Sequence, residues 1–299
     1  MEYIKSSYIF KELFSFLNEK QKLNMIIYNN ELQKMFLVNI EDYKKISGKY
    51  KIVEKNGKGK EYILNSNNLI FEGEYLNKKR NGEGKDYFLK GKIRFEGEYI
   101  NGKKWNGKGY DKNGNIEFEI KNGKGYIKEY NFEGQIIFEG DYLNGERNGK
   151  GKEYNNLGKL IFEGDYLNGE RNGKGKEYDY YGNIIFEGEY IKGKRNGEGK
   201  DYFLNGKLIF EGKYFNGKIW NGIRYNKNGN IEFEIKNGKG DIKEYNYDGS
   251  LKFEGEYKNG ERNGKGKEYE NESNVKFEGE YINGKRNGKG KTFYFNGSL

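Results

Sequence analysis

The sequence predicts a mainly β fold, an elongated single-layer ribbon of stacked antiparallel β-hairpins preceded by a short α-helical segment. One stretch, FEGDYLNGERNGKGKEY, occurs at residues 138–154 and again at residues 162–178. Its opening FEGDY alternates with period two, which places Phe138, Gly140 and Tyr142 on one face of a strand. High charge and few aliphatic residues are typical of disorder, but 28 Tyr and 20 Phe indicate buried rings.

The repeat organises most of the chain. A first unit begins at Ile46, and ten more begin at the aromatic residue of each FEG-like segment. From Phe71 the unit starts are spaced by 24, 23, 20, 24 and 24 residues, and the series then begins again. Residues 71–185 therefore return as 186–299, a block of five units that is duplicated as a whole. We predict a β-hairpin array of about eleven units over residues 46–299.

Each unit predicts one hairpin. FEGDY forms the first strand, the residues NGER carry the turn, and NGKGKEY forms the return strand. Glycine weakens a strand and often marks a close approach to the backbone, so we expect the Gly-x-Gly pairs to leave room for aromatic rings of neighbouring strands. An isolated hairpin is marginally stable, so the units are expected to stabilise one another by stacking.

Two units are shorter than the others. In FEIKNGKG, at residues 118–125, the dipeptide Asn122-Gly123 predicts a two-residue hairpin turn, and Asn237-Gly238 repeats it in the second block. Just before each short unit lies one of the two tryptophans, Trp105 and Trp220. Two interpretations stay open: the tryptophans anchor a partner or a membrane, or they fill the space left by the shorter hairpin.

The first 45 residues do not follow the repeat. Leu13, Phe16 and Leu17 have helical spacing, and so do later apolar residues, so we predict a helical N-terminal segment over residues 1–45. One interpretation makes this segment a cap over the open edge of the first hairpin. The N-terminus shows no secretory signal and no apolar run long enough to span a membrane, and we expect an intracellular, cytoplasmic protein.

The repeated pattern F-E-G-[ED]-Y-x-N-G-x-R-N-G-x-G-K resembles the MORN repeat over residues 46–299. Tyr stands where many MORN repeats have Trp, and Asn stands where many have His before Gly-x-Gly. The resemblance implies a twisted β-hairpin ribbon that serves as a scaffold, a membrane tether or an appendage of an enzyme. The repeat itself brings no catalytic residue.

A second resemblance concerns the N-terminal segment. Leu13-Phe14-Ser15-Phe16-Leu17 is similar to the core of the F-box, a helical module that docks on a cullin ubiquitin-ligase adaptor, and Leu23 falls where that family has its next leucine. The Leu-Pro opening and the late Trp of the F-box are missing. The resemblance implies a partner-binding role for Leu13, Phe14, Phe16, Leu17 and Leu23.

Composition excludes several kinds of chemistry. The chain has no Cys and no His, so disulfides, thiolate nucleophiles, Ser-His-Asp triads and Cys or His metal sites are excluded. We expect no enzyme, no cofactor and no metal. The net charge of +9 is spread among interleaved acids and bases, which disfavours nucleic-acid binding. Turn cations are candidates for contacts to anionic lipid: Lys194, Arg195, Lys285 and Arg286.

We therefore expect a non-enzymatic repeat scaffold that mediates protein–protein interaction through the ribbon. One alternative is an F-box-type substrate adaptor for a cullin ubiquitin ligase. Another is a peripheral tether that binds anionic phospholipid, with contacts that weaken as salt rises. Protein partners are expected in the first two cases, and side-by-side pairing of two arrays into a homodimer is left open.

Overall fold

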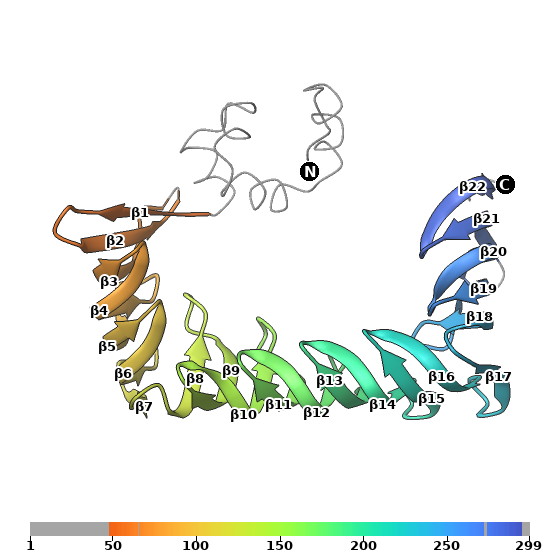
Figure 1. The fold of residues 1–299 in the computed structure, drawn as a ribbon, viewed down its shortest axis with the longest axis horizontal. Coiled ribbons are helices and arrows are strands. Elements are labelled where there is room, and N and C mark those ends of the chain that lie inside the picture. The colour runs from red at the N-terminus through yellow and green to blue at the C-terminus, as the bar shows by residue number, and fades with distance from the viewer. Residues whose placement is uncertain (1–47, 65, 272–273, 295–299) are drawn as a thin grey trace, which may run out of the picture. The chain divides into compact units, whose positions relative to one another are not determined.

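The computed structural model describes residues 48–64, 66–271 and 274–294. These residues form 22 strands (Figure 1), and within each sheet every strand pairs antiparallel with its neighbours in sequence. The mainly β fold of stacked hairpins that the sequence predicts is confirmed. The predicted helical segment, residues 1–45, lies outside the described residues.

The strands form three sheets, and within each sheet the strand order follows the chain. The seven-stranded sheet contains β1 (Lys49–Val53), β2 (Lys58–Ile63), β3 (Leu69–Leu76), β4 (Lys79–Tyr87), β5 (Ile93–Ile100), β6 (Lys103–Tyr110) and β7 (Ile116–Ile120). The ten-stranded sheet contains β8 (Gly125–Tyr130), β9 (Ile136–Leu143), β10 (Glu146–Tyr154), β11 (Leu160–Leu167), β12 (Glu170–Tyr178), β13 (Ile184–Ile191), β14 (Lys194–Tyr202), β15 (Leu208–Phe215), β16 (Lys218–Tyr225) and β17 (Ile231–Ile235). The five-stranded sheet contains β18 (Gly240–Tyr245), β19 (Leu251–Lys258), β20 (Glu261–Asn271), β21 (Asn274–Ile282) and β22 (Lys285–Thr292).

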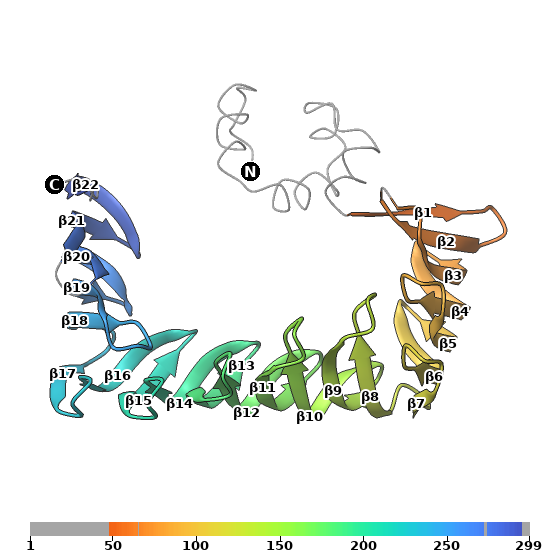
Figure 2. The ribbon, with the colours of Figure 1, turned by 180° about the vertical axis from the view of Figure 1, so that it is seen from behind.

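The chain divides into two compact units. The first comprises the described residues up to Glu117 together with 132–134, and the second comprises 118–131 and the described residues from Gln135 onward. The division therefore falls inside the repeat array. Seen from both sides, the hairpins β9/β10 to β15/β16 of the second unit lie next to one another in a single layer (Figures 1 and 2).

Every regular hairpin combines a tight turn with a bulge. In the hairpin β9/β10, Asn144 and Gly145 have φ values of 54° and 72°, as a two-residue type I′ turn requires. Three residues, 148–150, then lie opposite Asp141 and form a bulge. The short hairpin keeps the turn, since Asn122 and Gly123 have φ values of 49° and 69°. The two-residue turn predicted there is confirmed, but the segment that the short unit lacks is the bulge and not the turn.

Successive hairpins are joined by a backbone hydrogen bond between their turn ends. The turn glycine donates its N–H to the carbonyl of the arginine in the preceding hairpin: Gly169 to Arg147 at 2.9 Å, Gly193 to Arg171 at 2.9 Å and Gly217 to Arg195 at 2.8 Å. These bonds add to the strand ladders, so that each hairpin stabilises the next.

The ladder is interrupted at the short hairpin between β17 and β18. Only an isolated bridge, Lys236 to Lys239, joins the two strands, and the ten-stranded and five-stranded sheets separate there. Backbone bonds cross the interruption: Gly238 donates to the Trp220 carbonyl at 2.7 Å, and Gly260 donates to the Gly238 carbonyl at 2.9 Å. The short hairpin therefore remains bonded to the hairpins on both sides of it.

Candidate interaction surface

The face that carries Phe138, Gly140 and Tyr142 and their equivalents, called here the ring face, holds the core. Phe162 is fully buried, and its ring lies edge-to-face with Tyr166 and Tyr190 at centroid distances of 5.8 and 5.2 Å. A Cβ atom on Gly175 would lie 2.5 Å from Cζ of Phe162. The ring occupies the space that a side chain would need, so the paired glycines are a packing requirement.

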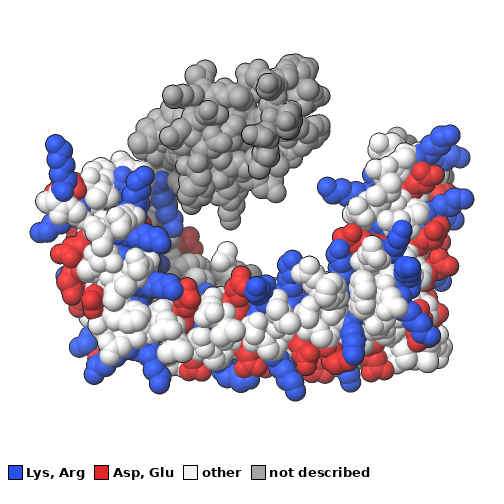
Figure 3. Space-filling view, in the orientation of Figure 1, with Lys and Arg blue, Asp and Glu red and all other residues white. Residues whose placement is uncertain are grey.

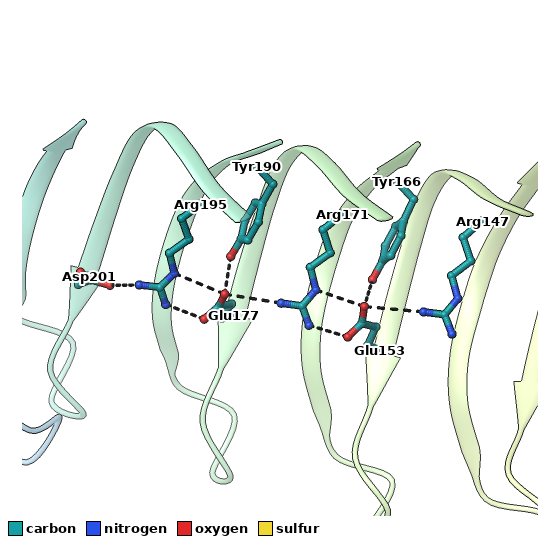
Figure 4. A network of polar contacts seen from close by, with 8 residues as sticks. All are labelled: Arg147, Glu153, Tyr166, Arg171, Glu177, Tyr190, Arg195 and Asp201. Carbon is teal, nitrogen blue, oxygen red and sulfur yellow. Dashed lines mark hydrogen bonds and ion pairs between the residues drawn. The ribbon is translucent and has the colours of Figure 1, made fainter. Parts of the chain in front are cut away.

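A polar ladder runs over these rings (Figure 4). Arg171 lies 3.9 Å from the Phe162 ring centroid and donates from Nη2 to Glu153 in the preceding hairpin at 2.5 Å. Tyr166 donates its hydroxyl to the same carboxylate at 2.6 Å. One hairpin later, Arg195 and Tyr190 both bond to Glu177, each at 2.6 Å. The ladder therefore links every hairpin of this stretch to the hairpin before it.

Electrostatics fix the charge states of the ladder. Burial alone would raise the pKa of Glu177, but the hydrogen bond and charge of Arg195 hold that pKa below its usual value. Burial and the bond to Glu177 raise the pKa of Tyr190. Ionised carboxylates and neutral phenols therefore satisfy one another, which makes the ladder a structural device.

The opposite face, called here the charged face, carries two rows of acids and bases. One row runs from Lys152 through Glu163, Lys176 and Glu187 to Lys200, since these residues are register partners on strands β10 to β14. The second row contains Lys150, Asp165, Lys174, Glu189 and Glu198. Figure 3 likewise shows acidic and basic side chains interleaved on the visible surface of the described residues. Neither sign dominates either row.

A trough lies between the two rows. It crosses strands β8 to β14, has a volume of about 790 Å³, and is floored by the backbone of glycines such as Gly151, Gly164 and Gly175. Tyr126, whose side chain is 53% exposed, lies at its β8 end. The walls are ordered by cross-strand bonds: Lys150 pairs with Asp165 at 2.7 Å, and Tyr178 donates to Glu163 at 2.5 Å. The trough is thus a preformed surface with hydrogen-bonded glycine backbone below and fixed charges on both sides.

The tryptophans lie near the turns of the hairpins β5/β6 and β15/β16, on the return strands β6 and β16. Trp220 is half-buried, its ring centroid lies 5.4 Å from that of Phe215, and its Cε3 atom would be 3.0 Å from a Cβ atom on Gly238. Trp220 thus packs against the turn of the short hairpin, in agreement with the gap-filling interpretation. Trp105 on β6 is also half-buried.

The candidate lipid contacts differ among themselves. Lys194 and Lys285 are exposed at hairpin turns. The Arg195 side chain is only 21% exposed, and it pairs with Asp201 at 2.8 Å as well as with Glu177. Arg286 pairs with Glu268 and lies 4.1 Å from the Phe277 ring centroid. The two lysines are available to a ligand, whereas both arginines belong to the ladder.

The remaining candidates lie outside the described residues: Leu13, Phe14, Phe16, Leu17 and Leu23. In the part of the chain that the structure describes, no three acidic side chains are grouped as a metal site would require. The same residues contain no helix with the length and hydropathy of a membrane span.

The ladder was not predicted from the sequence. In hairpins from β9/β10 onward, each ladder arginine bonds a glutamate 18 residues earlier, and each ladder tyrosine bonds a carboxylate 13 residues earlier. Those two recurring intervals are the signal that could have revealed it. The sequence analysis considered each arginine only as a turn cation, so its partner in the preceding hairpin was overlooked.

Comparison with known proteins supports the repeat. The family model described as MORN repeat matches residues 71–85, 138–156, 162–180, 186–206, 253–272 and 277–299. No curated protein matches the chain. Solved structures with similarity include TarM of S. aureus, at 10% identity over 67% of this chain and 27% of that chain with a TM-score of 0.16. A protein of unknown function from Bacteroides caccae aligns at 10% identity over 70% and 82% of the two chains, with a TM-score of 0.18.

This chain spans only about a quarter of TarM, 27% of its length. The family assignment rests on the six matched segments, which fall on regular hairpins from β3/β4 to β21/β22. The same hairpins repeat the buried phenylalanine, the glycine pair and the arginine ladder described above. The chain is therefore a MORN-repeat protein.

Proposed function

We propose that the protein is a non-enzymatic scaffold that binds a protein partner along the trough of its charged face. The observation that carries the proposal is the trough itself, which extends across seven strands and repeats a glycine floor beside charged side chains on β10 to β14. A reaction requires a few groups placed at one point, whereas this surface repeats its groups. Repetition suits an extended contact with a partner of matching period.

The charge pattern favours a protein over other polymers. Between Lys150 and Lys200 the two rows contain five Lys and five Asp or Glu, so their formal charges cancel. The first row alternates in sign, and such a row attracts a surface whose charges alternate in the opposite phase. It attracts a uniformly anionic polymer or membrane only weakly, because opposite contributions cancel over a few ångströms.

The test reverses charges on one wall. In a Lys152→Glu, Lys176→Glu variant the first row becomes entirely acidic up to Lys200, and we expect capture of partners from cells that make this protein to be lost. Lys159→Glu with Lys207→Glu is the matched control, because both lysines are exposed on loops away from the trough and the change in net charge is the same. A Lys152→Gln, Lys176→Gln variant removes charge without creating repulsion across the strands.

Circular dichroism and the thermal midpoint verify that each variant is folded. Recovery of the same partners by the trough variants and the wild-type chain would reject the proposal. Sedimentation with vesicles that contain anionic phospholipid distinguishes the tether, which predicts salt-sensitive binding that depends on Lys194 and Lys285 and not on the trough. The adaptor alternative depends on residues 1–45 and is tested by deleting them.

A further inference from the structure

The turn edge of the ten-stranded sheet carries a second repeated feature, separate from the trough. The residue before each turn of four successive hairpins is apolar and exposed: Leu143 is 43% exposed, Leu167 48%, Ile191 51% and Phe215 58%. The turns join β9/β10, β11/β12, β13/β14 and β15/β16, so antiparallel order places them along the same edge. Recurrent exposed apolar side chains mark a contact surface.

The residue after each turn is charged, and its sign changes halfway along the edge. The first two hairpins have Glu146 and Glu170, and the last two have Lys194 and Lys218. Each of these residues is the register partner of the apolar residue across its turn, as Leu167 and Glu170 show. The edge therefore has an acidic half and a basic half of equal length, with apolar residues at the same interval in both.

This arrangement is complementary to itself under a two-fold rotation. An axis at Ile191 on β13 brings Glu170 opposite Lys194 of another copy, and Ile191 opposite its own equivalent. The same axis brings Leu167 opposite Phe215 and Glu146 opposite Lys218. We infer that two copies of this chain associate antiparallel along the turn edges of β9 to β16, with the acidic half of each edge against the basic half of the other.

A second copy fits the edge better than a helix does. Hairpins recur about every 9.6 Å, which is twice the usual strand spacing. An α-helix repeats a heptad about every 10.5 Å, so a helical partner would drift by roughly 3 Å over the three steps of this edge. Another edge of the same protein has the same period and stays in register over its full length.

The charges at the centre are better placed than those at the ends. Glu170 and Lys194 are both exposed, whereas Lys218 already pairs with Glu261 at 2.7 Å. We therefore expect the Glu170–Lys194 pair, which occurs twice in a two-fold dimer, to determine the alignment. The first compact unit lacks the change of sign, because the corresponding residues Lys79 and Lys103 are both basic.

The test exchanges the central charges in the full-length chain. Sedimentation velocity of the wild-type chain over roughly two decades of concentration should show a monomer–dimer equilibrium. Glu170→Lys and Lys194→Glu should each raise the dimer dissociation constant at least about tenfold, because each variant places like charges opposite each other twice. An equimolar mixture of the two variants should restore dimerisation, since both pairs are then complementary.

Apolar variants test the remainder of the surface. Leu167→Ser with Ile191→Ser should abolish the dimer, whereas Leu157→Ser, at a 68% exposed leucine on the opposite edge, should leave it unchanged. A wild-type chain that stays monomeric would overturn the inference and leave the edge to another kind of partner. Single charge variants that still dimerise, or a mixture that fails to recover, would overturn it as well. The trough variants retain this edge, so the two proposals can fail separately.

Discussion

The two copies of the five-hairpin block surround one buried carboxylate with different residues. Asp86 in the first block and Asp201 in the second occupy the same position, 115 residues apart, on the return strands β4 and β14. Each pairs with the arginine of its own hairpin, Arg80 at 2.7 Å and Arg195 at 2.8 Å. The other residues around the two carboxylates differ, so the same backbone accommodates different sets of charged residues at this position.

Asp86 is surrounded by cations. Besides Arg80, Lys104 lies 3.5 Å and Arg94 lies 3.7 Å from its carboxylate, and Tyr99 donates a hydrogen bond at 2.9 Å. Burial alone would raise the pKa of Asp86, but the charges of Lys104, Arg80 and Arg94 hold that pKa below its usual value. The ionised carboxylate is therefore strongly favoured at this site.

Asp201 lacks two of these cations. Ile209 and Ile219 stand where the first block has Arg94 and Lys104. Burial raises the pKa of Asp201 and outweighs the lowering by Arg195 and the hydrogen bond from Tyr214. The second block carries another cation instead, Arg224, at the position of Gly109 in the first. The comparison shows that the fold requires an acceptor for the arginine and the tyrosine here, but not a fixed local charge.

The largest expected effect is a difference in the stability lost when each carboxylate is replaced by an amide. Asp86→Asn should lower the free energy of unfolding of its block by about 3 kcal/mol, because it leaves three cations partly buried without their carboxylate. Asp201→Asn should change stability by less than about 1 kcal/mol, because the loss of one ion pair is offset by removal of a desolvated charge. Urea unfolding followed by tryptophan fluorescence measures both.

The tryptophans allow the two blocks to be measured separately. Trp105 lies in the first block and Trp220 in the second, so Trp220→Phe and Trp105→Phe backgrounds each report one block. In a repeat array, local stabilities can differ along the chain. If Asp86→Asn and Asp201→Asn lose the same free energy of unfolding, each measured by the tryptophan of its own block, the predicted difference between the two sites is refuted.

The fold could be predicted from the sequence because its rules are local. Period-two aromatic residues define the strands, and Asn-Gly pairs define the turns, as Asn122-Gly123 shows. The bulge was not anticipated, because its Asn-Gly, as at Asn148-Gly149, also has turn composition. Only the ladder register shows that Asn148 and Gly149 lie in a bulge opposite Asp141.

The candidate surface was less accessible to sequence analysis. From the sequence, Arg195 is predicted to be a cation exposed at a turn. In the structure its side chain forms an ion pair with Glu177 in the preceding hairpin. Contacts between hairpins depend on how neighbouring units are stacked, which no single unit encodes. The difference between Asp86 and Asp201 likewise depends on residues from adjacent strands, at positions 94 and 104 in one block and 209 and 219 in the other.

As pH falls, the contributions of Asp201 and Asp86 to the stability of their blocks should change in opposite directions. The pKa of Asp201 is raised on folding, so the folded state binds its proton more readily and stability increases as pH falls from the raised pKa toward the unfolded value of about 3.9. The pKa of Asp86 is lowered, so its contribution is fully present above that value and is lost as pH falls through the lowered pKa. Unfolding midpoints of each wild-type block against its Asn variant measure these differences.

The comparison of wild type with variant removes the titration of other carboxylates. The difference in unfolding midpoint between wild type and Asp201→Asn should change in mildly acidic solution, above about pH 4. The corresponding difference for Asp86→Asn should change only below that pH. Two differences that change over the same pH range would contradict the opposite shifts.

The smallest predicted effect is that of a substitution that introduces one cation of the first block into the second. Ile219→Lys places a cation where Lys104 stands beside Asp86, at a half-buried position on β16. The new ammonium group should lower the pKa of Asp201 and stabilise the second block at neutral pH by about 1 kcal/mol. NMR titration of the carboxyl carbon measures the pKa, and Trp220 fluorescence in urea measures stability. Ile219→Met, which keeps a long apolar side chain without the charge, is the matched control. If the lysine variant leaves the pKa of Asp201 unchanged, the missing cations do not account for the difference between the blocks, and Arg224 would have to be tested in their place.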